Sequence, residues 1–109
     1  MDIHPVTKGH VLVAPRAHHD QITKTPLPLL QKLISVVQRV AHAQVTGLKA
    51  DGINVTQANG AIAGQVIGHI HFHVIPRWAA DTHSWNNPQE KYDSDTEANE
   101  YADAMRKAL

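Results

Sequence analysis

Three histidines at alternate positions are the residues of this sequence best suited to chemistry: His69, His71 and His73. Apolar Ile70 and Phe72 lie between them, and this alternation is typical of a β-strand, which sends successive side chains to opposite faces. We therefore expect the three imidazoles on one face, with neighbours about 6–7 Å apart. Because clustered imidazoles disfavour one another's charge, a solvated face without chemistry is the least favoured of three interpretations.

The spacing alone leaves the other two interpretations open. Imidazole is a common metal ligand, and alternate strand residues can bind zinc together. Alternatively, one neutral imidazole attacks a substrate while its neighbours orient it and bind an anion, which is covalent catalysis. The sequence contains no cysteine, which excludes a disulfide framework and a thiolate zinc site.

The flanking residues favour covalent catalysis. The run from His69 to Ile75 fills every position of a motif in which three histidines are separated and followed by apolar residues. A second motif runs from Asp2 to Pro15 and is followed by His18. From Asp2 to about Trp78 the sequence resembles the histidine triad (HIT) family of nucleotide hydrolases and transferases. Family members usually carry a helix and one or two strands before the position of Asp2. We expect either that the gene is short or that its true start lies upstream of Met1.

The resemblance implies a reaction and assigns roles in it to four histidines. His71, the middle histidine, is implied to attack the α-phosphorus of a nucleotide, and water then cleaves the nucleotidyl-histidine. His69 and His10 are implied to form a hydrogen-bonded pair beside it. His73 is implied to contact the phosphate oxygens and to stabilise the charge that develops there. These four residues are the predicted catalytic residues.

The resemblance also implies which residues bind the substrate. Asp2 is expected to accept hydrogen bonds from the ribose hydroxyls, and Ile3 to touch the base. Gln65 is expected to contact the α-phosphate. Asn59 is expected either to reach the phosphate or leaving group or to act only as a turn residue. Val66 departs from the family pattern, because many members have a serine or threonine there that offers a hydroxyl to the leaving group.

The elements that must position these residues form a predicted α+β layer. Antiparallel strands are expected at 9–15, 53–57 and 69–76, with an amphipathic helix from Pro26 to Val45 packed on one face. Thr25 is expected to cap this helix at its N-terminus.

The predicted layer is completed by a loop and a second helix. Gly47 is expected to end the first helix, and residues 79–93 have no regular period, which predicts a loop. Ser94 and Glu97 form a capping-box pattern, and the apolar spacing that follows predicts a C-terminal helix. The whole chain, 1–109, is expected to form one HIT-like domain with its motifs in residues 2–78.

Charge and length limit the class of protein. The 109 residues include ten basic and ten acidic side chains, so nothing indicates an extended nucleic-acid or membrane-binding surface. No signal sequence or run of membrane-spanning length is present. We therefore expect a cytoplasmic protein with neither nucleic acid nor membrane as a partner.

The resemblance predicts a hydrolase or nucleotidyl transferase that cleaves the α-phosphate linkage of purine nucleotides, either dinucleoside polyphosphates or nucleoside phosphoramidates. No metal or other cofactor is expected, because a histidine attacks and no water needs activation by zinc. The alternative is a nucleotide- or metal-binding regulatory module without efficient catalysis. A homodimer is expected as well, for two reasons. An open strand edge can pair with another chain. In addition, one helix cannot cover all the apolar strand residues, which are Val11, Val13, Ile53 and Val55.

Overall fold

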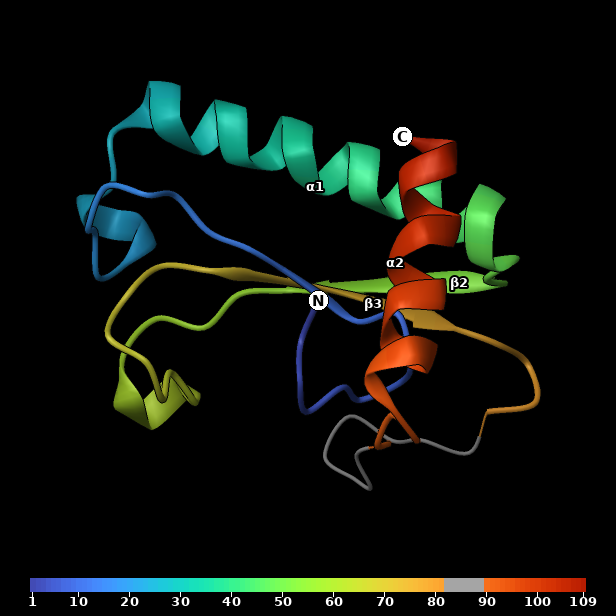
Figure 1. The fold of residues 1–109 in the computed structure, drawn as a ribbon. Helices are drawn as coiled ribbons and strands as arrows, with labels where there is room; N and C mark the ends of the chain where they lie inside the picture. Colours follow the sequence, from blue (N-terminus) through green and yellow to red (C-terminus); the bar gives the residue numbers. More distant parts are fainter. Residues whose placement is uncertain (82–89) are drawn as a thin grey trace.

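The computed structural model describes residues 1–81 and 90–109, and this part of the chain forms a three-stranded sheet with two α-helices (Figure 1). The strands are β1 (Val11–Val13), β2 (Gly52–Thr56) and β3 (Phe72–Arg77). The helices are α1 (Leu27–Leu48) and α2 (Asp95–Ala108), and two short 3-10 helices are η1 (Ile22–Lys24) and η2 (Ala61–Ala63). The predicted α+β class is confirmed.

The sheet is antiparallel with the order β1-β3-β2, so the histidine-bearing strand is central. Directly opposed residues share a face of the sheet. One set of opposed residues is Val11, Val74 and Val55, and the next set is Leu12, His73 and Thr56. The predicted alternation therefore separates an apolar face from a face that carries His73.

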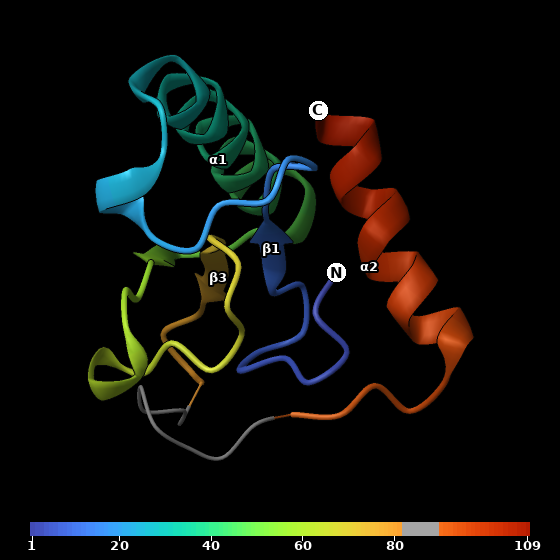
Figure 2. The ribbon, with the colours of Figure 1, turned by 90° about the vertical axis from the view of Figure 1, so that its left-hand side faces the viewer.

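Helix α1 lies across the apolar face, and no helix of the described residues covers the other face (Figures 1 and 2). Leu33 and Val37 of α1 pack with Ile70, Phe72 and Val74 in the buried core. Burying such side chains contributes roughly 1.5–3 kcal/mol each. The core therefore fixes β3 from one side and leaves its histidine side accessible.

Strands β1 and β3 begin later than the sequence predicts, whereas β2 begins one residue earlier, at Gly52. Before β3, the backbone N–H of Ile70 donates to the carbonyl of His19 (2.7 Å). Before β1, the backbone N–H of His10 donates to the carbonyl of Thr7 (3.1 Å). These backbone groups are satisfied by nearby loop residues, so regular pairing starts only at Val11 and Phe72.

Both predicted ends of α1 are wrong. Thr25 does not cap the helix, because its hydroxyl donates to the carbonyl of Gln21 (2.7 Å) and closes the turn around η1. The helix continues through Gly47 to a left-handed Lys49 with φ +57°. Gly47 instead lies against α2, which crosses the C-terminal part of α1 (Figure 1): a Cβ at Gly47 would overlap the carbonyl oxygen of Ala104. The absence of a side chain therefore serves close helix packing.

The predicted capping box of α2 is confirmed. The Ser94 hydroxyl accepts from the Glu97 backbone N–H (3.1 Å), and the Glu97 carboxylate accepts from the Asp93 N–H (3.1 Å). Residues 82–89, the middle of the predicted loop, lie outside the described residues. Among the helices that are described, none has the combination of length and apolarity needed to cross a membrane.

Candidate active site

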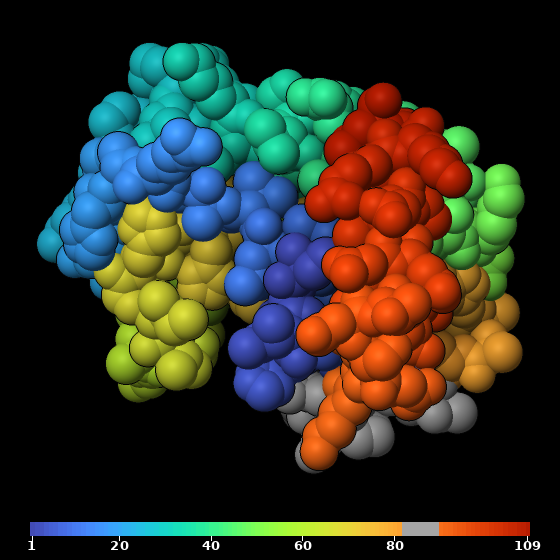
Figure 3. Space-filling model, viewed as in Figure 1, coloured from blue at the N-terminus to red at the C-terminus, as the bar shows by residue number. Residues whose placement is uncertain are grey.

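A pocket of about 610 Å³ opens on the face of the sheet that α1 does not cover. In the space-filling view, the surface is hollowed between the N-terminal segment and the loop around η2 (Figure 3). Three of the predicted catalytic histidines line this pocket: His10, His71 and His73. Asp2, predicted to bind ribose, lines it as well, whereas His69 is not part of the lining. The fold therefore brings four predicted site residues into one cavity.

A tight turn before β1 aims the His10 ring at the pocket. The backbone N–H of Val6 donates to His10 Nδ1 (3.1 Å). Gly9 permits the turn because its φ is +96°, a conformation that side-chain-bearing residues rarely adopt. On α1, the buried Gln44 amide donates to the Gly9 carbonyl (3.0 Å) and to a carbonyl of β3 (2.9 Å). Helix α1 thereby ties this turn to the central strand.

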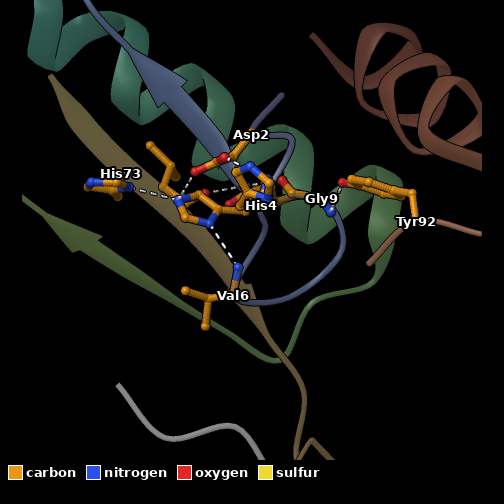
Figure 4. Close-up of polar contacts among 9 residues, drawn as sticks. Asp2, His4, Val6, Gly9, His73 and Tyr92 are labelled. Atoms are coloured by element: carbon orange, nitrogen blue, oxygen red, sulfur yellow. Dashed lines mark hydrogen bonds and ion pairs between the residues drawn. The ribbon is translucent and has the colours of Figure 1, made fainter. Parts of the chain in front are cut away.

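Hydrogen bonds determine where the protons lie on His10 and His73 (Figure 4). The Val6 N–H can only donate, so His10 Nδ1 accepts, and the neutral ring carries its proton on Nε2. His10 Nε2 lies 2.8 Å from His73 Nδ1 and therefore donates to it. His73 then carries its own proton on Nε2, the atom available to a ligand in the pocket.

His71 has the complementary arrangement. Its Nδ1 lies 2.8 Å from the carbonyl oxygen of His69, which can only accept. Nδ1 therefore carries the proton, and the lone pair of the neutral ring is on Nε2. The His71 and His73 rings are in edge contact, with centroids 5.0 Å apart. An unprotonated nitrogen beside an N–H donor can attack an electrophile while the donor stabilises a developing oxyanion.

Burial keeps the paired histidines neutral. The His10 side chain is almost completely buried, and this burial lowers its pKa to about 4, against the opposing attraction of Asp2 and with a further contribution from His73. Burial also lowers the pKa of His73, and the nearby His71 lowers it further. Near neutral pH both rings are therefore uncharged, as the assigned proton positions require.

The expected hydrogen-bonded pair of His69 and His10 is wrong, since His10 pairs with His73. The register of β1 and β3, continued along the ladder, places position 10 beside 75 and position 16 beside 69. His69 is therefore carried away from His10. Its Nε2 lies 2.8 Å from the Pro15 carbonyl oxygen, and its ring stacks on His18 with centroids 5.4 Å apart.

The remaining predicted substrate residues border the pocket without lining it. The Asn59 side-chain oxygen accepts the first backbone N–H of η1 (2.7 Å). The Gln65 oxygen accepts the Gly60 N–H (2.7 Å), and its NH₂ donates to a carbonyl just before η1 (2.6 Å). Both amides thus shape the loop around η2, and the side chain of Ile3 is 80% exposed. Substrate contact by these three residues stays a prediction.

One group of side chains has donor atoms close enough to hold a metal ion. Asp2, His10 and His73 each offer a ligand atom, and these atoms lie within 4.8 Å of one another. His10 could bind a metal through Nε2 only after its proton moved to Nδ1, where it would oppose the Val6 N–H. The donor set therefore does not fit a metal without breaking the turn that places His10.

Sequence reasoning missed the residues that hold the site's backbone. Gln44 lies among apolar residues on the sheet-facing side of α1, and a polar residue in that stripe was a detectable signal. Thr7 is completely buried, and its hydroxyl donates to the Pro76 carbonyl. Val6 acts through its backbone N–H, which has no side-chain signature.

Comparison with protein families places this fold and histidine cluster in a known class: the HIT domain matches residues 1–80. The chain belongs to the HIT domain family. An uncharacterized HIT-like protein of Saccharolobus solfataricus is 38% identical over 81 residues, which cover 74% of this chain and 58% of that protein. Two further relatives have named activities. Adenylylsulfatase HINT3 of Arabidopsis thaliana is 35% identical over 88 residues, with 75% of this chain and 45% of that protein covered.

Adenosine 5′-monophosphoramidase HNT1 of Saccharomyces cerevisiae is 38% identical over 77 residues, with 71% of this chain and 46% of that protein covered. The chain thus spans about half the length of the relatives it matches. Among solved structures, a HIT-like protein of Bartonella henselae has a TM-score of 0.88 at 34% identity. The match covers 100% of this chain and 77% of that protein's chain. A zinc-bound histidine triad protein of Mycobacterium smegmatis has a TM-score of 0.84 at 35% identity. The match covers 98% of this chain and 76% of that protein's chain.

The lowered pKa of His10 predicts a specific pH dependence of stability. Between the unfolded pKa of about 6.5 and the folded pKa of about 4, only the unfolded chain takes up the proton. The free energy of unfolding should therefore fall by about 2–3 kcal/mol through His10 as pH drops across this window. Urea unfolding of wild type and His10→Asn at several pH values measures it.

The variant should have a shallower pH dependence than wild type. His42→Asn, at an exposed position on α1, is the matched control and should keep the wild-type slope. Equal slopes for wild type and His10→Asn would show that burial of this ring is not coupled to folding.

Proposed function

We propose that this chain is a nucleotide hydrolase or nucleotidyl transferase that forms a covalent intermediate on His71. The observation that carries the proposal is the His71 Nδ1–H bond to the His69 carbonyl (2.8 Å), which leaves Nε2 unprotonated in the pocket. Membership in the HIT family and the phosphoramidase and adenylylsulfatase names of two relatives support it.

The reaction proceeds in two displacements. In the first, His71 Nε2 attacks the α-phosphorus, a P–N bond forms, and the leaving group departs with the electron pair of its bond to phosphorus. The ring becomes cationic, and the His69 carbonyl on Nδ1–H stabilises that charge. His73 donates its Nε2–H to a phosphate oxygen, and Asp2 binds the ribose. In the second displacement, water attacks phosphorus and releases a proton to solvent, while the P–N bond breaks and returns its electron pair to Nε2, which restores the neutral ring.

The charge of the pocket favours phosphoramidates over dinucleoside polyphosphates. Among the described residues that line it, no lysine or arginine is present, and Asp2 contributes an acidic side chain. A polyphosphate chain would bring several negative charges with no cation to balance them. Apolar Ala63, Val66 and Ile67 line the wall next to the loop around η2. A nucleoside monophosphate joined to an uncharged leaving group therefore fits this pocket best.

Loss of the His71 ring should abolish the covalent intermediate. We expect intact-mass analysis of wild type, quenched during turnover of adenosine 5′-monophosphoramidate, to show one adenylyl group per chain. His71→Ala should show none and should lose on the order of 10⁴-fold in kcat/KM. His42→Ala, outside the pocket, serves as the control and should behave like wild type. An adduct that persists in His71→Ala would assign the nucleophile elsewhere.

The alternative is a metal- or nucleotide-binding regulatory module without efficient catalysis. The zinc-bound structural relative favours it, whereas the donor atoms of Asp2, His10 and His73 would hold a metal only if the Val6 contact to His10 were broken. The two functions differ in their response to chelation. If His71 is the nucleophile, EDTA treatment followed by desalting should leave kcat within about twofold of the untreated value, because no metal-bound water is required. Stoichiometric zinc in the purified protein, with activity lost on chelation and restored by zinc, would support the alternative.

We also propose a homodimer that uses one side of α1 and the open edge of β2. Helix positions 27, 34 and 45 lie on one stripe, since their spacing of seven and eleven residues returns to nearly the same direction. Leu27, Ile34 and Val45 on this stripe, and Val55 on β2, are each 45–64% exposed. An exposed apolar stripe on α1 and an edge of β2 that pairs with no other strand of the described residues both favour association with a second copy. The cytoplasmic location expected from the sequence stays a prediction.

A charge on this stripe should separate the subunits. Ile34→Asp should sediment as a monomer at micromolar concentration while wild type sediments as a dimer, because an unpaired carboxylate cannot be buried in an apolar interface without a large free-energy cost. Ser35→Asp places the same charge one residue away, on another exposed part of α1, and should remain dimeric. A wild-type chain that is monomeric under these conditions would refute the dimer.

A further inference from the structure

We propose that Tyr92, which lies outside the part of the chain matched by the HIT domain, is a positioning residue of the candidate active site. Its phenol oxygen accepts the backbone N–H of Gly9 (2.8 Å; Figure 4), immediately before His10. Through this contact the C-terminal segment holds the turn that determines the proton position on the His10 ring. The proposal rests on the proposed function, because it explains how that reaction's hydrogen-bond donor is kept in place.

Four contacts attach the segment 90–97 to the loop 5–9. The Glu90 N–H donates to the carbonyl of Pro5 (2.9 Å), and the Glu90 carboxylate accepts the backbone N–H of Lys8 (3.3 Å). The Lys8 ammonium group lies 2.8 Å from the Glu97 carboxylate. The Tyr92 bond to Gly9 is the fourth contact. In Figure 1 the segment after residue 90 runs beside the N-terminal loop before α2 begins.

Among these contacts, the Tyr92 bond has the largest consequence if it is lost. The Lys8 and Glu97 side chains are partly exposed, and such ion pairs contribute little to stability. Gly9 is buried, so its N–H has no access to water and would remain unpaired without the phenol. The turn would have to shift in order to satisfy it.

A shift of this turn would change the hydrogen bonding of the His10 ring. The Gly9 peptide groups are held on both sides, the N–H by Tyr92 and the carbonyl by Gln44 (3.0 Å). The same turn carries the Val6 N–H that occupies His10 Nδ1. When this N–H moves away, the proton of the neutral His10 ring is no longer restricted to Nε2. His73 then loses its fixed donor, and its own Nε2–H is no longer guaranteed in the pocket.

Tyr92→Phe tests the proposal with Tyr101→Phe as the matched control. The two tyrosine rings are in edge contact, with centroids 5.9 Å apart, and Gly9 donates only to Tyr92. With ¹⁵N-labelled histidine at pH 7, the His10 Nδ1 resonance should indicate an unprotonated nitrogen in wild type and Tyr101→Phe. In Tyr92→Phe it should shift toward the protonated value.

Steady-state kinetics with adenosine 5′-monophosphoramidate provide the second readout. In Tyr92→Phe, kcat should fall about fivefold, the loss expected for one hydrogen bond, with KM within about twofold of wild type. A lower melting temperature with unchanged His10 resonances and unchanged kcat would reduce Tyr92 to a structural role and overturn the proposal. If wild type shows no turnover, the proposed function fails, whereas the resonance still decides whether Tyr92 positions His10.

Fluorotyrosine keeps the test valid if Tyr92→Phe does not fold. The chain has two tyrosines, so in a Tyr101→Phe background the label enters only at position 92. Fluorine weakens the phenol oxygen as an acceptor while preserving its shape. The His10 resonance should shift in the same direction as in Tyr92→Phe and by a smaller amount, and an unchanged resonance would contradict the proposal.

Discussion

The hydrogen bond between His10 Nε2 and His73 Nδ1, 2.8 Å long, is the interaction on which the site depends. It forms only because β1 and β3 pair in one register, with Leu12 opposite His73. A slip of one residue would turn every side chain of a strand to the other face. The apolar partners Val11 and Val74, packed under α1, oppose such a slip. The core that stabilises the sheet therefore also selects which histidines meet.

Burial of this pair has a cost that the surrounding backbone offsets. A buried imidazole must remain neutral, and every buried polar group needs a partner. Val6 and Thr7 supply these partners from the turn, and Gln44 supplies two N–H donors from α1. The Gln44 oxygen has no hydrogen-bond partner among the described residues, a loss of about 1–3 kcal/mol. Its amide nitrogen binds carbonyls on both sides of the site, which explains a polar residue in the core.

The parts of the fold that could be predicted from sequence are those set by local patterns. Alternation around Phe72 predicted the face that carries His71 and His73, and Ser94 with Glu97 predicted the start of α2, because both signals lie within a few residues. The partner of His10 depends on the pairing of strands sixty residues apart, which no local pattern encodes.

For the same reason, the amides of Asn59 and Gln65 could not be assigned to the loop from sequence. Their partners at Ile22, Gly60 and Asp20 become neighbours only in the fold. Gly47 shows the converse case. A glycine near a helix end is typical of a stop signal, but here the crossing of α2 requires it, and only the tertiary structure distinguishes these two roles.

The site is distributed over the chain because side chains are proposed to contact the substrate, whereas backbone groups from other segments position those side chains. The groups proposed to contact substrate, from Asp2 to His73, all lie within the HIT match of residues 1–80. The turn that aims His10 is held in addition from residues 90–97. A side chain's identity can be read from a family motif, whereas the proton it carries depends on whatever holds its backbone partner. Segments outside the motif can therefore make two HIT domains with identical histidines differ. The difference would be in the proton position on the histidine equivalent to His10, and hence in whether the histidine equivalent to His73 can donate a hydrogen bond.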